Sequence, residues 1–185
     1  NSEVAQAMSD ARAFDELRLD PYYRRLAAVH PSLAPVLGSL IESSQSRRHA
    51  LVLGDFSPKN ILLVPGGLRL VDFETGHCGD PPFDLGFFLT HLALKGVRAG
   101  AADDRCFALA QRFWTTYITA MSPLIAADDS FEQRCVTHWT ACLLASVDGK
   151  SPVDYLDESQ QNLVRTFALD SNLSPASNFP NAITA

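Results

Sequence analysis

The chain of 185 residues has no excess of basic side chains, no closely spaced cysteine pair and no long apolar run. Lysine and arginine number 15 against 21 aspartates and glutamates, which gives a formal net charge of −6. A nucleic-acid binder needs a basic face and is not expected here. No apolar stretch has the length needed to cross a membrane, and the first residues lack the pattern of a signal peptide. We therefore expect a cytoplasmic protein without a nucleic-acid or membrane partner.

The four cysteines, Cys78, Cys106, Cys135 and Cys142, are scattered and form no CxxC motif. A hydrophobic content of 46% is enough for one domain with its own core, so disulfides are not needed and the thiols are expected to be reduced. His138 lies between Cys135 and Cys142 at helical spacing, which would allow a zinc site. The apolar neighbours of these three residues favour an ordinary buried helix instead.

Helical periodicity covers most of the chain. One such apolar stripe consists of Leu33, Leu37, Leu40 and Ile41. Asp20 and Pro21 are suited to the N-cap and first position of a helix, and Gly96 is suited to a helix end. The expected helices cover residues 3–18, 20–30, 30–44, 82–96, 103–121, 129–147 and 155–169.

A short β segment interrupts the helices. Residues 50–53 ("ALVL") are typical of a buried strand, and residues 61–64 ("ILLV") and 68–71 ("LRLV") flank the turn "PGG". Gly66 and Gly67 can supply the positive φ angles of a tight hairpin turn. The fold class expected is therefore mainly α with a small antiparallel β insert (α+β).

Three polar residues lie at the ends of these strands. Asp55 follows the first strand, Asn60 begins the hairpin and Asp72 ends it, so Asn60 and Asp72 are expected to share one space with Asp55 at its rim. Mg²⁺ prefers hard oxygen ligands and takes few protein groups besides phosphate oxygens, which suits an amide and a carboxylate. A further carboxylate can accept the proton of an attacking hydroxyl, and Lys59 can neutralise charge on a transferred phosphoryl group.

These motifs resemble those of a known family. "GDFSPKN" (54–60) followed by "VDFE" (71–74) resembles the catalytic core of the aminoglycoside phosphotransferase and choline kinase-like family, small-molecule kinases related in fold to protein kinases. "GDPPFDLGFFLTHL" (79–92) and, more loosely, "DGKSPVDYL" (148–156) resemble segments of the same group. The motifs in this order are specific, although each alone is weak.

The resemblance implies a role for each matching residue. Asp55 would be the catalytic base, acting with Lys59, and Asn60 and Asp72 would bind Mg²⁺ and, through it, ATP. Asp84 would be a structural carboxylate that accepts backbone N–H bonds from the catalytic loop. Glu74 would contact a second metal or a cationic substrate. Residues 1–170 would form the C-terminal lobe of a protein-kinase-like fold, and residues 171–185 a loose tail.

The chain departs from the family pattern in two respects. Leu53 stands where the family has a histidine that hydrogen-bonds within the loop. The 54 residues before Asp55 are predicted to be helical, and no glycine-rich phosphate loop, Walker sequence or strand lysine occurs. The chain also begins with Asn1 rather than methionine, as expected of a fragment, a processed product or a truncated open reading frame.

Two functions remain open from sequence alone. The first is the catalytic lobe of an ATP- and Mg²⁺-dependent kinase that phosphorylates a hydroxyl of a small molecule, expected to be inactive as this isolated chain because the other lobe is absent. The second is a truncated or degenerate, non-catalytic kinase-like lobe that acts as a binding module or is a gene fragment. Aminoglycosides, choline-like amines, sugars and homoserine-like compounds all remain as substrates, because specificity lies in variable helical regions.

Overall fold

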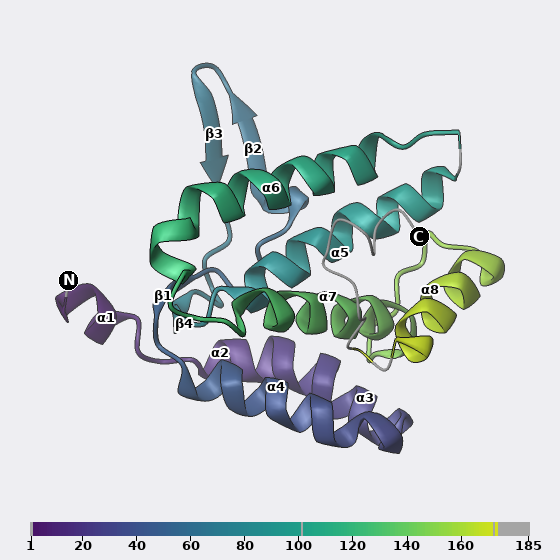
Figure 1. Cartoon of the computed structure of the whole chain (residues 1–185), viewed down its shortest axis with the longest axis horizontal. Coiled ribbons are helices and arrows are strands. Elements are labelled where there is room, and N and C mark those ends of the chain that lie inside the picture. Colours follow the sequence, from purple (N-terminus) through teal and green to yellow (C-terminus); the bar gives the residue numbers. More distant parts are fainter. Residues whose placement is uncertain (1, 101, 172, 174–185) are drawn as a thin grey trace.

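The structure, a computed structural model, describes residues 2–100, 102–171 and 173, and most of these residues are helical (Figure 1). The predicted class, mainly α with a small antiparallel β insert, is confirmed. The helical elements are α1 (Ser2–Ala7), α2 (Arg12–Phe14), the π-helix η1 (Asp15–Arg24), α3 (Arg25–Val29), the 3₁₀-helix η2 (Pro31–Leu33), α4 (Ala34–Ser46), the 3₁₀-helix η3 (Pro58–Asn60), α5 (Pro82–Ala99), α6 (Arg105–Ile125), α7 (Phe131–Asp148) and α8 (Glu158–Asp170).

The β structure consists of two antiparallel pairs. Strands β2 (Ile61–Val64) and β3 (Gly67–Leu70) form the predicted hairpin, which projects from the helical body in Figure 1. Strand β1 (Ala50–Val52) pairs with β4 (His77–Gly79), a strand that the sequence did not predict. Three residues without apolar alternation give no recognisable strand signal, so only the pairing with β1 reveals it.

Helix α7 is the centre of the core, with α4 on one side of it and α5 on the other (Figure 1). Gly86 of α5 allows the close approach of α5 and α7, because a Cβ atom there would lie 2.6 Å from the backbone nitrogen of Trp139. Cys135, His138 and Cys142 are fully buried in α7. The Tyr23 hydroxyl lies 2.7 Å from His138 Nδ1, so this histidine belongs to a core hydrogen bond.

The N-terminal helices differ from the prediction. Asp20 and Pro21 do not begin a helix, because the π-helix η1 runs through both of them. A proline inside an α-helix removes one backbone hydrogen bond, and its ring collides with the carbonyl of the preceding turn. The wider π-type turn relieves that collision, so helical structure continues through Pro21 into α3.

The end of α5 also differs from the prediction. Gly96 does not end the helix but lies buried within it, where a Cβ atom would come within 2.6 Å of the Phe107 ring. Gly100 terminates α5 instead, with a positive φ of 73°. Gly96 is therefore required for the packing of α6 on α5. Most of the predicted loose tail, residues 171–185, lies outside the described residues, and none of the described helices has the length and apolar character that a bilayer crossing requires.

Candidate functional site

The candidate site is the loop between β1 and β2, and Gly54 sets its shape. Gly54 has a φ of +68°, a conformation that L-amino acids rarely adopt. A Cβ atom at this position would lie 2.9 Å from the Phe14 ring and 2.9 Å from two oxygens of Thr75. The chain can therefore turn here only with glycine, and this turn directs the next residue, Asp55, inward.

Asp84, in the first turn of α5, accepts hydrogen bonds from the backbone of the loop. The backbone N–H groups of Leu53 and Gly54 donate to its two carboxylate oxygens at 2.6 Å and 2.8 Å. Burial raises the pKa of Asp84 to about 6, an effect that these two hydrogen bonds reduce and the nearby charge of Asp55 increases. At pH 7 the group is mainly ionised, which is the form that accepts both N–H donors best.

Thr75 also bonds the loop, and His77 in turn contacts the backbone of Thr75. The Thr75 hydroxyl donates to the carbonyl of Leu53 at 2.7 Å, and His77 Nδ1 lies 2.9 Å from the carbonyl of Thr75. Burial lowers the pKa of His77, so its ring is neutral at pH 7. The backbone of Leu53 is thus bonded at both its N–H and its carbonyl, although the side chain that the family has at this position is missing.

Asp55 is only 4% exposed, and both of its carboxylate oxygens have partners. Arg18 Nη2 lies 3.0 Å from Oδ1, and Lys59 Nζ lies 3.0 Å from Oδ2. Arg18 also donates through Nε to the carbonyl of Gly54 at 2.9 Å. The Arg18 side chain is 14% exposed and that of Lys59 is 63% exposed, so only Lys59 can swing freely away from the carboxylate.

Asn60 is buried beside Asp55. Its Nδ2 donates to Asp55 Oδ2 and to the main-chain oxygen of Asp55, both at 3.0 Å. Both partners are acceptors, so the amide nitrogen must face them and the amide oxygen Oδ1 must face away. The N–H of Val71 donates to the carbonyl of Asn60 at 3.0 Å, which places the next residue, Asp72, beside Asn60 along the backbone.

Asp72 and Glu74 are exposed at the end of the hairpin, and within the described residues neither side chain makes a hydrogen bond or ion pair. Asp72 has a φ of +66°, which is uncommon for a residue other than glycine. The structure therefore brings Asp55, Lys59 and Asn60 into direct contact and places Asp72 next to them through the backbone only. We expected Asp55 at the rim. It is instead the buried member of the group, because Arg18 covers it.

The oxygen atoms that Asn60 and Asp72 present are of the chemical type that Mg²⁺ prefers. Asn60 Oδ1 has no protein partner in the described part of the chain, and Asp72 offers an unpaired carboxylate. Both are hard oxygen donors, and an amide with one carboxylate is a sufficient protein contribution when phosphate oxygens and water complete the coordination.

Aromatic rings adjoin Arg18 on the helical side of the site. The Arg18 guanidinium carbon lies 5.6 Å from the centre of the Phe87 ring. Tyr22 and His91 contact the same ring, with centroid distances of 5.8 Å and 4.9 Å. Burial lowers the pKa of His91 to about 4, so this ring is neutral at pH 7. Tyr22 and His91 are half-buried and form an uncharged surface near Asp55.

The sequence did not indicate Arg18 or Thr75 as part of the site. Arg18 contacts a loop 36 residues away, and no motif or spacing marks it among the helical residues around it. Thr75 follows Glu74, and nothing in the sequence around it indicates a contact with the loop. Their contacts depend on the tertiary structure and have no local signal.

A comparison with known families bears on this geometry. Residues 2–122, which are 121 of the 185 residues, match the family described as the phosphotransferase enzyme family. The chain belongs to this family. The predicted resemblance to aminoglycoside phosphotransferases and choline kinases is thereby confirmed, and membership of the phosphotransferase family implies a kinase-like fold. A comparison with curated proteins found no match.

The matched segment of this phosphotransferase-family chain extends from α1 into α6. It includes the loop that carries Asp55 and Asn60, the hairpin with Asp72, and Asp84. Helices α7 and α8 lie beyond the match, yet α7 supplies the centre of the core.

Proposed function

We propose that this chain is the catalytic lobe of a small-molecule kinase, which transfers a phosphoryl group from ATP to a hydroxyl of its substrate with Mg²⁺. Residues 1–170 form this lobe in the proposal. The observation that supports it most is the contact between Asp55 and Asn60, in which the amide nitrogen orients the carboxylate and the amide oxygen faces away from it. An isolated turn residue would not need this arrangement.

Asp55 acts as the base in this proposal. The substrate hydroxyl approaches Oδ2 after Lys59, the more exposed partner, moves toward the incoming phosphate. Arg18 remains on Oδ1 and keeps the carboxylate in one orientation. Lys59 then neutralises charge on the transferred group, which is the usual task of a lysine in phosphoryl transfer.

Asn60 and Asp72 would hold the metal through Oδ1 and the exposed carboxylate. Mg²⁺ supplies charge neutralisation at the phosphate oxygens when it is bound. Asp84 acts only through the loop, because both of its oxygens are bonded to backbone N–H groups. Glu74, exposed two residues after Asp72, is placed to meet a second metal or a cationic substrate.

The hairpin beside Asn60 presents a surface that supports a nucleotide site completed by further protein. Many of its exposed side chains are apolar, although Arg69 is exposed among them, and an apolar patch of this kind commonly marks an interaction surface. We propose that another lobe, which holds the nucleotide from the opposite side, covers this surface. The exposed apolar residues are Leu62, Leu63, Leu68, Leu70, Val71 and Phe73.

The experiment is a phosphoryl-transfer assay on two proteins, the 185-residue chain and the product of the longest open reading frame that contains it. Both are incubated with [γ-³²P]ATP, Mg²⁺ and panels of aminoglycosides, amino alcohols, sugars and hydroxy-amino acids. Transfer by the longer product, with weak or no transfer by the 185-residue chain, is the expected result. If neither protein transfers phosphate to any panel and neither binds Mg²⁺–ATP by calorimetry, the non-catalytic binding module is the correct alternative.

A further inference from the structure

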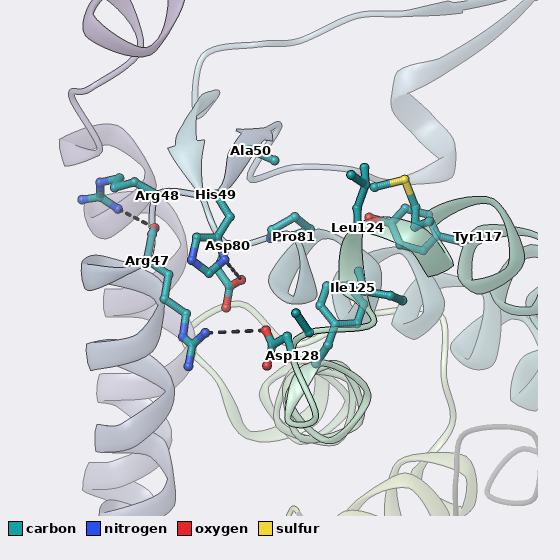
Figure 2. Close-up of a pocket in the computed structure, with 13 residues that line it drawn as sticks. Arg47, Arg48, His49, Ala50, Asp80, Pro81, Tyr117, Leu124, Ile125 and Asp128 are labelled. Carbon is teal, nitrogen blue, oxygen red and sulfur yellow. Dashed lines mark hydrogen bonds and ion pairs between the residues drawn. The ribbon is translucent and has the colours of Figure 1, made fainter. Parts of the chain in front are cut away.

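A cavity of about 760 Å³ lies away from the candidate catalytic loop (Figure 2). It is bounded by residues 47–50 at the start of β1, by Asp80 and Pro81, by the second half of α6, and by the turn between α6 and α7. Ala50 lines it, whereas Asp55 follows the other end of β1. None of the residues that line the cavity belongs to the loop that carries Asp55 and Asn60, so the cavity and this loop are lined by different residues.

One side of the cavity is apolar. Tyr117, Met121, Leu124 and Ile125 lie on one face of α6, because residues four, seven and eight positions apart share a helix face. The Tyr117 ring is stacked with the Phe131 ring, parallel within 5° at a centroid distance of 6.5 Å. Leu124 is 76% exposed, so this face of α6 is open to an apolar ligand.

The opposite side carries two carboxylates that are already paired. Arg134 donates to Asp80 at 2.9 Å and 3.2 Å, and to Asp128 at 2.8 Å and 3.1 Å. The hydrogen bonds from Arg134 hold the pKa of Asp128 well below its usual range. Asp80 is 4% exposed. Both carboxylates are therefore already partnered by Arg134.

The other basic side chains on this side make only long contacts with these carboxylates. Arg47 Nη1 lies 3.6 Å from Asp128, and His49 Nδ1 lies 3.8 Å from Asp80. Figure 2 shows Arg47, Arg48 and His49 on one side and the apolar α6 residues on the other. The lining residues Arg47 and Arg48, with the adjoining Arg134, give 3 − 2 = +1 against Asp80 and Asp128, in a chain whose net charge is −6.

We propose that this cavity binds a small amphipathic anion, with a carboxylate at Arg47 and an alkyl or aryl group against α6. The volume is within the range of sites that take small organic ligands, roughly 300 to 1,000 Å³. A guanidinium forms two parallel hydrogen bonds with a carboxylate, and Arg47 has donors free for this because its contact with Asp128 is long. The apolar group would cover the exposed face of Leu124 and its neighbours.

The two methionines of the chain provide the test. Met121 lines the cavity, whereas Met8 lies beside Gly76 and its carbonyl accepts a hydrogen bond from Cys78. With [ε-¹³C]methionine-labelled chain, titration with octanoate is expected to shift the Met121 methyl signal in a saturable way and to leave Met8 unchanged. Octan-1-ol and octylammonium, which have the same chain length, are expected to bind at least tenfold more weakly. No shift of Met121 with octanoate up to 5 mM, or octylammonium binding as tightly as octanoate, overturns the proposal.

Variants test the carboxylate-binding role of Arg47 and the apolar part of the cavity separately. Arg47→Gln is expected to weaken octanoate binding about tenfold and to leave octan-1-ol binding unchanged. Arg47→Lys keeps the positive charge, so it should reduce octanoate affinity by a smaller factor. Arg112→Gln, an exposed arginine of α6 outside the cavity, is the matched control and should bind as the wild type does. Ala127→Trp, at the exposed turn, should block both ligands. Wild-type octanoate affinity in Arg47→Gln, or in Ala127→Trp, contradicts the proposed site.

Discussion

Arg18 and Asp55 form a buried ion pair, 3.0 Å long, between the π-helix η1 and the loop that follows β1. Arg18 makes a second bond to the carbonyl of Gly54, so one side chain holds both the backbone and the carboxylate of the loop. A loop carboxylate that must keep one orientation benefits from such a contact, because loops are otherwise the most mobile parts of a domain. The π-helical turn that places Arg18 is therefore part of the candidate site.

Arg18→Met should reduce the free energy of unfolding by about 3 to 5 kcal/mol, because it leaves Asp55 buried without its more buried cationic partner. Arg24→Met removes an arginine of the same helix from the more exposed pair with Asp15, and should cost less than about 1 kcal/mol. Urea denaturation of both variants measures the difference. Adding Asp55→Asn to Arg18→Met should recover part of the loss, and equal small losses in the two single variants would show that the buried pair does not hold the loop.

Gly54→Ala should destabilise the chain more than Gly66→Ala. Both glycines have a positive φ, which costs an L-residue about 1 to 2 kcal/mol. At Gly66 nothing lies within 4 Å of the new Cβ atom, whereas at Gly54 it would lie 2.9 Å from Phe14 and Thr75. The overpacking should add about 1 to 3 kcal/mol at Gly54. Thermal unfolding compares the variants, and similar losses for both would mean that the loop can rearrange around a side chain.

Asp84 should make the stability of the chain depend on pH between about 4 and 6. Its pKa is raised to about 6 by burial, against an ordinary value of 3.8. As the pH rises through this window the unfolded chain loses a proton that the folded chain keeps, so the free energy of unfolding falls. The free energy of unfolding of the wild type, measured relative to that of Asp84→Asn, should therefore fall by about 3 kcal/mol as the pH rises across this window. It should stay constant at higher pH.

Urea titrations at several pH values measure this difference. The ¹³C signal of the Asp84 carboxyl in the wild type gives the pKa directly and is independent of whether Asp84→Asn folds. A carboxyl that titrates near pH 4 would show that the two backbone hydrogen bonds outweigh the effect of burial.

The sequence was sufficient for features with local signals. The hairpin was predicted from two apolar runs around Gly66 and Gly67, and Leu33, Leu37 and Leu40 of the predicted stripe are buried as expected. Strand β4 and the continuous helix through Pro21 were missed, because both depend on partners distant in sequence or on a rare helix type.

The candidate site likewise contains residues that local motifs predicted and residues that only tertiary contacts reveal. The order of Asp55, Asn60, Asp72 and Asp84 was enough to indicate the family, because each lies within a compact motif. Arg18 reaches its loop from 36 residues away, so no motif could contain it. The burial of Asp55 follows from that contact and was not predicted either.

Asp55 and Asp72 should differ in their effects on catalysis in whichever protein shows transfer activity. Asp55→Asn keeps the size of the side chain but cannot take the hydroxyl proton, so kcat should fall about 10²- to 10⁴-fold with the KM for ATP nearly unchanged. Asp72→Asn removes a charged metal ligand, so it should raise the KM for ATP and the Mg²⁺ requirement as well as lower kcat. Leu53→His should leave both binding constants unchanged and, if anything, raise kcat.

Steady-state kinetics at several Mg²⁺ concentrations, with direct calorimetry of Mg²⁺–ATP binding, separates these effects. Asp154→Asn, an exposed aspartate outside the site, is the control and should behave as the wild type does. The contrast follows from the positions of the two groups: Asp55 is buried against Arg18 and Asn60, where a proton acceptor is held in place, and Asp72 is exposed, where a hydrated metal can reach it. Full turnover in Asp55→Asn with any accepted substrate would remove Asp55 as the base, and the kinase mechanism would then have no acceptor for the hydroxyl proton at this site.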